Sequence, residues 1–286
     1  MSAYRFCRTD DIGLLVDALN RCWAPYFPEE PPTDAASFKR SIRDLQVWCS
    51  SCMVAFSGSD PIGVLIGAKR PSGTLVHKIA VHPDHRRQGH GRHLLASLGS
   101  KLAILGPPRI VAEVPEALAP ARALFRAGGY LQEALLTDYV LPFDSRGSAA
   151  PAQGSLVIPV TVDDLVANDL LVEAHPHGCW QRSVATLVAR KDEIEGLAVA
   201  SDERIEAYVL YVNSGTEETE IVSLRSSIDD GGERLKQLLG QLRARGMETL
   251  RFPKVHPAEI SKEWLEALGF SPACGHLLYA ARAQSA

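Results

Sequence analysis

Long apolar runs are missing from this sequence of 286 residues. No uninterrupted apolar stretch approaches about 18 residues, the length that a transmembrane helix requires. The opening segment, from Met1 to Asp11, lacks the apolar core of a signal peptide. From these two absences we expect a cytoplasmic protein.

An excess of positive charge is missing as well. Lysine and arginine number 30 against 34 acidic residues, which gives a formal net charge of −4. A chain of this charge has no general affinity for nucleic acid or for an anionic membrane. We therefore expect neither as a partner, and any basic patch is better suited to a small anionic ligand.

Cysteines are few and scattered, six in all, and a chain of this length does not need a disulfide framework. The only close pair is Cys49 and Cys52, within a stretch from Val47 to Phe56 that reads as a strand. A redox dithiol and half of a zinc site are the alternatives to a pair of buried thiols. A second Cys-x-x-Cys is missing, so we expect buried thiols and no metal site.

The length is sufficient for two domains, and the chain repeats itself with an offset of about 140 residues. Leu124–Tyr130, for example, corresponds to Trp264–Phe270. A stretch of small residues, glycine and proline joins the halves and favours a linker. We expect one domain over residues 1–145, a linker over 146–155 and a second domain over 156–286.

Each half has the same order of elements: strand, two helices, three strands, helix, strand, helix, strand. This order predicts an α/β fold in which helices cover a mixed sheet. The N-terminal ends of the first helices, near Asp11 in one half and Thr161 in the other, carry the residues of an N-cap.

A basic, glycine-bearing turn follows the strand that ends at His82-Pro83, and a helix with Leu94, Leu98 and Leu102 on one face follows the turn. Such a junction directs backbone N–H groups and the positive end of the helix dipole at one point. The glycines of the turn let an anion approach the backbone, and the arginines add positive charge. The pattern predicts a phosphate or diphosphate site.

Two familiar phosphate motifs do not fit this turn. A dinucleotide fingerprint would need a third glycine at Leu94, and no Gly-Lys-Ser/Thr completes a P-loop. The remaining pattern, Arg86-x-x-Gly89-x-Gly91, resembles the acetyl-CoA motif of the GCN5-related N-acetyltransferase (GNAT) family. The resemblance implies two tandem GNAT domains, each with a splayed mixed sheet, and acetyl-CoA as co-substrate without a metal.

In that family the loop amides hold the CoA diphosphate, and the preceding strand pairs with the pantetheine arm. The resemblance therefore implies a cofactor-binding set in this chain: Ile79, Ala80, Val81, Arg86, Arg87, Gln88, Gly89, His90, Gly91 and Arg92. The implied activity is transfer of an acetyl group to a primary amine of a small molecule or peptide by direct attack. Another acyl-CoA donor, a hydroxyl acceptor, and a CoA-binding pseudoenzyme without turnover are the alternatives.

Amide formation needs a base, because a free alkylamine has a pKa near ~10 and is protonated at neutral pH. His77 is the first candidate, since His77–His82 resembles the motif strand of arylalkylamine acetyltransferases. Glu113, the last residue of an expected strand over Arg109–Glu113, is the second. The resemblance also implies an oxyanion donor among the N–H groups of residues 79–81, at a bulge. Where the family often has a tyrosine as thiol proton donor, this chain has Phe125.

The second half departs from the motif at the equivalent turn. Asp229, Asp230 and Glu233 stand where the first half has arginines. A carboxylate within about 5 Å of a diphosphate is repelled by roughly 1–3 kcal/mol near a protein surface. We expect a degenerate second domain, its two aspartates capping a helix, and one CoA per chain. Trp23–Pro28, between the first two helices, is a candidate wall for an apolar or aromatic acceptor; the alternative is packing under a proline-rich loop.

Overall fold

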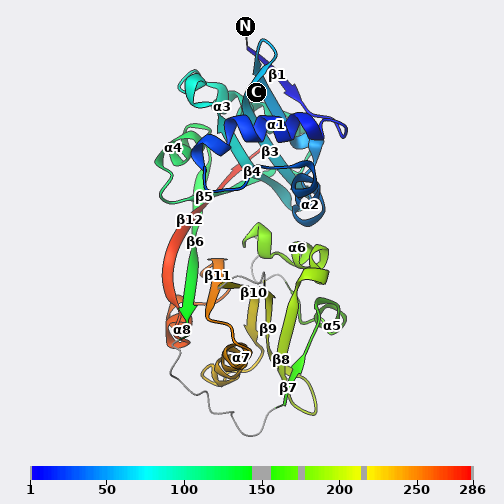
Figure 1. Ribbon diagram of the computed structural model, residues 1–286, viewed down its shortest axis with the longest axis vertical. Coiled ribbons are helices and arrows are strands. Elements are labelled where there is room, and N and C mark those ends of the chain that lie inside the picture. Colours follow the sequence, from blue (N-terminus) through cyan, green and yellow to red (C-terminus); the bar gives the residue numbers. More distant parts are fainter. Residues whose placement is uncertain (1, 144–155, 173–177, 214–217, 285–286) are drawn as a thin grey trace. The chain divides into compact units, whose positions relative to one another are not determined.

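The computed structural model describes residues 2–143, 156–172, 178–213 and 218–284. The chain has a mixed α/β fold, and the order of elements is the same in its two halves, as the sequence predicts (Figure 1). The linker expected over residues 146–155 lies outside the described residues. None of the described helices is long and apolar enough to cross a membrane.

The first half contains six strands, four α-helices and three short 3-10 turns within its described residues. The helices are α1 (Ile12–Cys22), α2 (Ala35–Leu45), α3 (His90–Leu105) and α4 (Ala119–Ala127), and the turns are η1 (Ala24–Tyr26), η2 (Cys49–Ser51) and η3 (Pro83–His85). The strands are β1 (Ser2–Phe6), β2 (Met53–Ser57), β3 (Asp60–Arg70), β4 (Gly73–Val81), β5 (Arg109–Pro115) and β6 (Leu131–Pro142).

The second half repeats this series. Its described helices are α5 (Val162–Ala167), α6 (Val184–Ala189), α7 (Glu233–Ala244) and α8 (Lys262–Ala267), with turns η4 (Trp180–Arg182) and η5 (Lys191–Glu193). Its strands are β7 (Leu156–Pro159), β8 (Glu195–Ala200), β9 (Ile205–Asn213), β10 (Glu218–Ser226), β11 (Thr249–Val255) and β12 (Ser271–Arg282).

The chain forms two compact units whose membership does not follow the sequence halves. One unit comprises the residues up to Ala134 together with those from Leu277 onward, and the other comprises Leu135–His276. The last strand of each half, β6 or β12, therefore contributes residues to both units. Leu277 and Tyr279 of β12 belong to the same buried cluster as residues of α3 and β5, because β12 covers the edge of β5 that would otherwise be unpaired. The boundaries 1–145 and 156–286 stay a prediction about the sequence halves.

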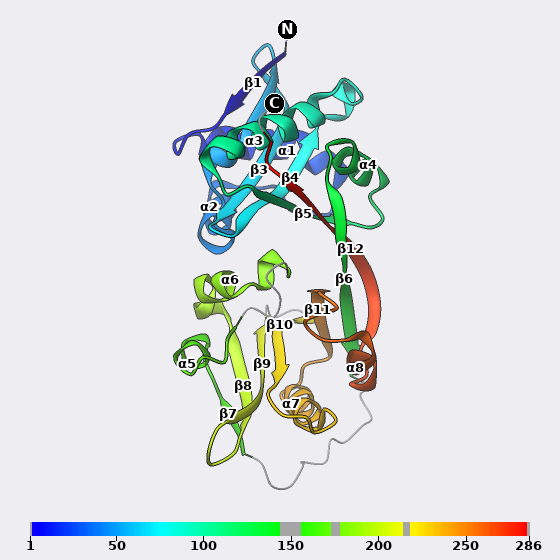
Figure 2. The ribbon, with the colours of Figure 1, turned by 180° about the vertical axis from the view of Figure 1, so that it is seen from behind.

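The first unit has the strand order β1-β2-β3-β4-β5-β12. Neighbours from β1 to β4 are antiparallel, whereas β4 and β5 are parallel and pair only at Thr74–Ile110 and Leu75–Val111. Helix α1 lies on one face of this sheet and α3 on the opposite face (Figures 1 and 2). Beyond the two paired positions β4 keeps an open edge toward β5.

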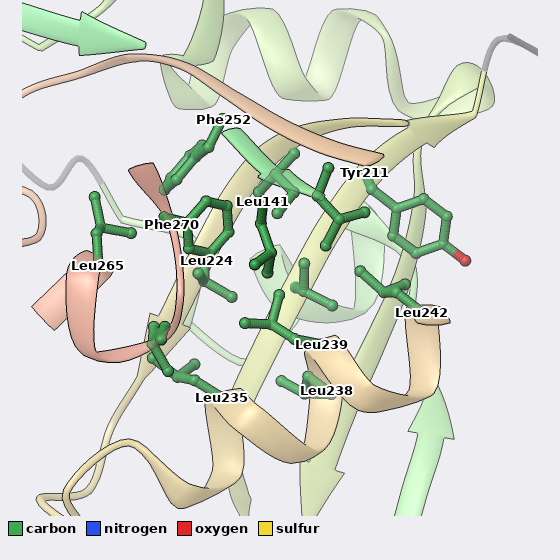
Figure 3. Packing of buried hydrophobic residues seen from close by; sticks show 14 of the residues in the cluster. Leu141, Tyr211, Leu224, Leu235, Leu238, Leu239, Leu242, Phe252, Leu265 and Phe270 are labelled. Carbon is green, nitrogen blue, oxygen red and sulfur yellow. The ribbon is translucent and has the colours of Figure 1, made fainter. Parts of the chain in front are cut away.

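The second unit has the order β6-β11-β10-β9-β8-β7. Helix α7 packs on one face of this sheet and turns its leucines toward Tyr211, Phe252 and Phe270 (Figure 3). The four leucines, at the i, i+3, i+4 and i+7 spacing of one helix face, are Leu235, Leu238, Leu239 and Leu242. Each such fully buried side chain contributes roughly 1.5–3 kcal/mol to folding.

The two N-caps expected at the first helix of each half have different outcomes. Thr161 caps α5 in a capping box with Asp164, as predicted. Asp11 does not cap α1; its carboxylate accepts instead from the backbone N–H of Arg8, at 2.7 Å, and from the Arg5 guanidinium. The prediction for that end was wrong because the aspartate is held by the turn that precedes the helix.

The thiols of Cys49 and Cys52 are buried, and neither is in a disulfide. Cys49 is the first residue of η2 and Cys52 follows its last; β2 begins only at Met53, so the expected strand over 47–56 is interrupted by a turn. Among the described residues, no group of three histidine, cysteine, aspartate or glutamate side chains is arranged to hold a metal ion.

Candidate functional site

The turn before α3 has the backbone geometry of an anion site. Gly89 is the N-cap residue and has a φ of 87°, in the left-handed region that favours glycine, and Arg87 two residues earlier has a φ of 64°. The N–H of His93 donates to the Gly89 carbonyl at 3.0 Å. The N–H groups of the three residues between them therefore have no acceptor within the helix, and they lie at the positive end of its dipole.

Three arginines surround this helix end. Arg86, Arg87 and Arg92 are all exposed, and within the described part of the chain none of them makes an ion pair. The Arg86 guanidinium lies 5.7 Å from the centre of the Tyr26 ring. Guanidinium groups without a carboxylate partner can take phosphate oxygens through paired N–H donors.

Two residues of the motif have roles that the sequence did not reveal. A Cβ added at Gly91 would lie 3.2 Å from both terminal carbons of Leu124, so this glycine also lets α3 pack against α4. The His90 side chain is buried, and its Nδ1 lies 2.6 Å from the Tyr4 hydroxyl. The His90 side chain is therefore engaged with Tyr4, which leaves the backbone N–H of His90 as its group available to an anion. Gln88 is exposed within the turn.

The strand that leads into this turn presents backbone groups at its open edge. The N–H of His82 donates to the Ile62 carbonyl of β3, at 2.9 Å, whereas the Val81 carbonyl accepts from the Tyr26 hydroxyl at 2.7 Å. Because successive residues of a strand direct their backbone groups to opposite sides, Ile79 and Val81 face the open edge and Ala80 faces β3. Ala80 contributes a buried side chain instead.

His77 is the extra residue of a β-bulge. Lys78 pairs with Ile66 and Val76 pairs with Gly67, which leaves His77 without an opposite residue on β3. As a result Val76 and Ile79, three positions apart, both pack on the cluster that contains the leucines of α3. The family resemblance implied a bulge at residues 79–81, but the structure has it at His77, where the pairing of β4 with β3 shifts by one residue.

His77 and Glu113 flank the point where β4 and β5 part. The last paired residues are Leu75 and Val111, and each candidate base lies two residues beyond one of them. Both side chains are half-buried. Glu113 alternates with Ala112 and Val114, which face the α3 side of the sheet, so its side chain is on the other face.

The connection between α1 and α2 is attached to β4 at two points. The Tyr26 hydroxyl bonds to Val81, as described, and the Lys78 ammonium lies 3.1 Å from a Glu30 carboxylate oxygen and 4.5 Å from the centre of the Trp23 ring. Trp23 donates its indole N–H to Glu30 at 3.0 Å and stacks on Phe27. Sequence reasoning singled out the aromatic residues but missed Glu30 and Lys78, because their contact joins distant parts of the chain.

Phe125 occupies the position where the resemblance implies a tyrosine. Its ring is 3% exposed and packs edge-on against Tyr130, with centroids 5.1 Å apart, and against Tyr279. The side chain at this position therefore serves the core of the first unit and offers no hydroxyl.

The equivalent helix end in the second unit carries its own anion. Gly232 caps α7 with a φ of 85°, close to the 87° of Gly89. The Asp230 carboxylate accepts from the N–H of Gly232 at 3.0 Å and from that of Arg234 at 2.9 Å. Asp230 thus binds the start of α7 as expected, whereas among the described residues Asp229 has no such bond. The two N–H groups that Asp230 accepts, of Gly232 and Arg234, correspond to those of Gly89 and Gly91 at α3.

Comparison with known proteins supports the assignment of the fold. The model of the acetyltransferase (GNAT) family matches residues 14–130, and a search of curated proteins finds no match to this chain. Among solved structures, a tandem GNAT protein from the clavulanic acid biosynthesis pathway is 18% identical, with a TM-score of 0.69 over 100% of both chains.

Two further structures are similar over almost the whole chain. A GCN5-related N-acetyltransferase from Sphaerobacter thermophilus is 13% identical, with a TM-score of 0.68, and covers 99% of this chain and 96% of its own. A second, from Anabaena variabilis, is 13% identical with a TM-score of 0.65 and covers 99% and 73%. At these identities the similarity concerns the fold. Together with the family match, it leads to one conclusion: residues 14–130 form a domain of the acetyltransferase (GNAT) family, and the whole chain has the fold of the tandem GNAT protein.

Proposed function

We propose that the first half of the chain is an N-acetyltransferase that uses acetyl-CoA and acetylates a primary amine of a small molecule or peptide by direct attack. The observation that carries the proposal is that two features are adjacent. The open edge of β4 ends at the turn before α3, where the candidate anion site lies. A ligand with an amide-bearing arm and a diphosphate matches both.

The residues present fit CoA. The N–H groups of residues 90–92 and the three unpaired arginines would hold the diphosphate, at about 1.5–3 kcal/mol for each hydrogen bond to a charged group. The backbone groups of Ile79 and Val81 would pair with the amides of the arm, as an added strand does at a sheet edge. The acyl group supplies an activated carbonyl at the far end of that arm.

His77 is the base that we propose for removal of the amine proton, with Glu113 as the alternative. A neutral imidazole with a pKa near ~6.5 accepts a proton at physiological pH, directly or through one water. A backbone N–H at the open edge of β4, near Ile79, would stabilise the oxyanion. The thiol leaves as a thiolate or takes a proton from water, since a thiol pKa is only ~8.5 and Phe125 offers no hydroxyl.

The experiment is release of free thiol from acetyl-CoA across a panel of amines, with the acetylated product identified by mass. Turnover with a primary amine supports the proposal, and faster turnover with another acyl-CoA would correct the donor. Phe125 is the observation that favours the alternative, a CoA-binding pseudoenzyme. Tight binding of acetyl-CoA without turnover with any amine would establish that alternative instead.

A further inference from the structure

The second unit contains a groove of about 720 Å³ that the transfer reaction does not use. It lies where β10 ends and α8 begins, and its walls include Leu235, Ile260 and Trp264. The volume is within the range of small-molecule sites, roughly 300–1,000 Å³. In the repeat, this is the counterpart of the anion site of the first unit.

A phosphate ligand does not fit this groove. The Asp230 carboxylate already accepts the N–H groups of Gly232 and Arg234 at the start of α7. The Arg234 guanidinium donates to Glu206 at 2.9 Å. Because the Asp230 carboxylate already binds two N–H groups at this helix end, an added diphosphate would be repelled by that carboxylate and by Asp229 in the groove wall.

The groove retains one charge of each sign. Arg225 and Asp229 both line it, and within the described part of the chain neither makes an ion pair. Glu259, the third charged residue of the lining, is held by the two terminal nitrogens of Arg182, at 2.7 and 2.6 Å. One guanidinium and one carboxylate are therefore available to a ligand.

An aromatic surface lies beside these charges. Trp264 packs partly buried against the core of the second unit, and it also lines the groove. A Cβ added at Gly232 would lie 3.8 Å from the Trp264 indole, so the indole is next to the N-terminal end of α7, where Asp230 is bound. An indole in such a position gives an apolar or aromatic group a large contact area.

We propose that this groove binds a small zwitterion, an amino acid with an apolar or aromatic side chain. Arg225 takes the ligand carboxylate through two parallel N–H donors, and Asp229 takes the ammonium group. The side chain packs on Trp264. The site is independent of acetyl transfer and makes the second unit a ligand-binding domain, although its anion site is closed.

The test follows the indole N–H signal of Trp264 by NMR in the full chain. The chain has four tryptophans, so the signal can be assigned from its loss in Trp264→Phe. The probes are phenylalanine, phenethylamine, which lacks the carboxylate, and 3-phenylpropionate, which lacks the ammonium group. CoA is the fourth probe.

We expect phenylalanine to shift the Trp264 signal in a saturable way. Phenethylamine and 3-phenylpropionate, which each carry only one of the two charges, should bind at least about 10-fold more weakly. Asp229→Asn should weaken phenylalanine binding by a similar factor, whereas the exposed Asp202→Asn, which is outside the groove, should not. The dispersion of the amide signals verifies that each variant is folded.

Three results would overturn the proposal. One is a response to CoA equal to or stronger than that to phenylalanine. Another is equal affinity for phenylalanine and phenethylamine. The third is no shift of the Trp264 signal by phenylalanine up to about 10 mM.

Discussion

At the scale of single residues, the position of His77 in β4 is the basis for its proposed role as the general base. As the extra residue of a bulge it is released from the regular alternation of β4, at the point where β4 and β5 part. We expect His77→Ala to lower kcat/KM for the amine by about 10²-fold, the usual scale of general-base catalysis, and to leave the Kd of CoA unchanged. The pH dependence of the rate, measured for both proteins, should lose its acidic limb in the variant.

Glu113→Gln is the matched variant for this prediction, because Glu113 lies at the corresponding position on β5. If His77→Ala retains near-normal turnover and Glu113→Gln loses it, the base is the glutamate. Loss of CoA affinity in His77→Ala would show that the histidine supports the strand rather than the proton transfer.

Asp138 is the residue on which we expect the stability of the second unit to depend most strongly. Its buried carboxylate accepts from the Arg251 guanidinium at 2.8 Å and from the Lys254 N–H at 2.9 Å, and the His276 ring lies 3.5 Å away. Burial alone would raise the pKa of Asp138, but the donors, with His276 and Arg251 first, hold the pKa well below its ordinary value. Asp138→Asn should therefore lower the free energy of unfolding at pH 7 by about 1.5–3 kcal/mol, the scale of a hydrogen bond to a charged group, because Arg251 is partly exposed to solvent.

The sign of the pH dependence follows from the lowered pKa. A carboxyl with a folded pKa below its unfolded value, near ~4, contributes its full stabilisation above that value and loses it as the pH falls toward the folded pKa. Urea unfolding should show a constant difference between the two proteins from about pH 7 to 5 and a smaller one below about pH 4. The exposed Asp202→Asn should match the wild type throughout, and a difference that does not narrow in acid would contradict the assignment.

At the scale of elements, the connection between α1 and α2 competes for the edge of β4 that CoA would use. The Tyr26 hydroxyl occupies the Val81 carbonyl, one of the backbone groups at the open edge. A net hydrogen bond contributes about 0.5–1.5 kcal/mol. We expect Tyr26→Phe to bind CoA about 2- to 10-fold more tightly in calorimetry, since the arm no longer displaces a hydroxyl.

The control for this prediction is Tyr208→Phe, which removes a tyrosine hydroxyl from the second unit, where it lies 3.3 Å from the Leu170 carbonyl. That variant should bind CoA like the wild type. Weaker binding by Tyr26→Phe would mean that the hydroxyl helps to hold the arm rather than competing with it.

At the scale of the whole molecule, the two halves have the same order of elements but different helix ends. Three unpaired arginines surround the start of α3, whereas Asp230 closes the start of α7. We expect calorimetry to give one CoA per chain. Arg86→Glu should weaken this binding at least about 10-fold, because it places a carboxylate beside the diphosphate.

Arg225→Glu is the matched change in the second unit, and it should leave the CoA stoichiometry and affinity unaltered. Two equivalent sites, or loss of CoA binding in Arg225→Glu, would contradict the assignment of the nucleotide to the first half.

Much of this protein follows from local pattern alone. The order of elements is the same in both halves because apolar periodicity and turn residues are properties of short windows, and a repeat in the sequence becomes a repeat in the fold. The Gly89 N-cap and the capping of α7 by Asp230 follow from residue chemistry at a helix end, which depends on only a few neighbours. The match of residues 14–130 to the acetyltransferase (GNAT) family follows for the same reason, since the motif is contiguous.

Only the tertiary structure decided which distant residues meet. The attachment of Glu30 and Tyr26 to β4, the position of the bulge at His77 and the burial of Asp138 depend on pairing between separate elements, and no local pattern encodes that pairing. The division of the chain into two units also depends on long-range pairing. Strands β6 and β12 each contribute residues to both units, because a strand pairs with an exposed edge that the fold leaves open. The sequence by itself determined the elements and the repeat, and it pointed to the candidate anion site, through short-range chemistry. The contacts around that candidate site arise from the long-range packing of the folded chain.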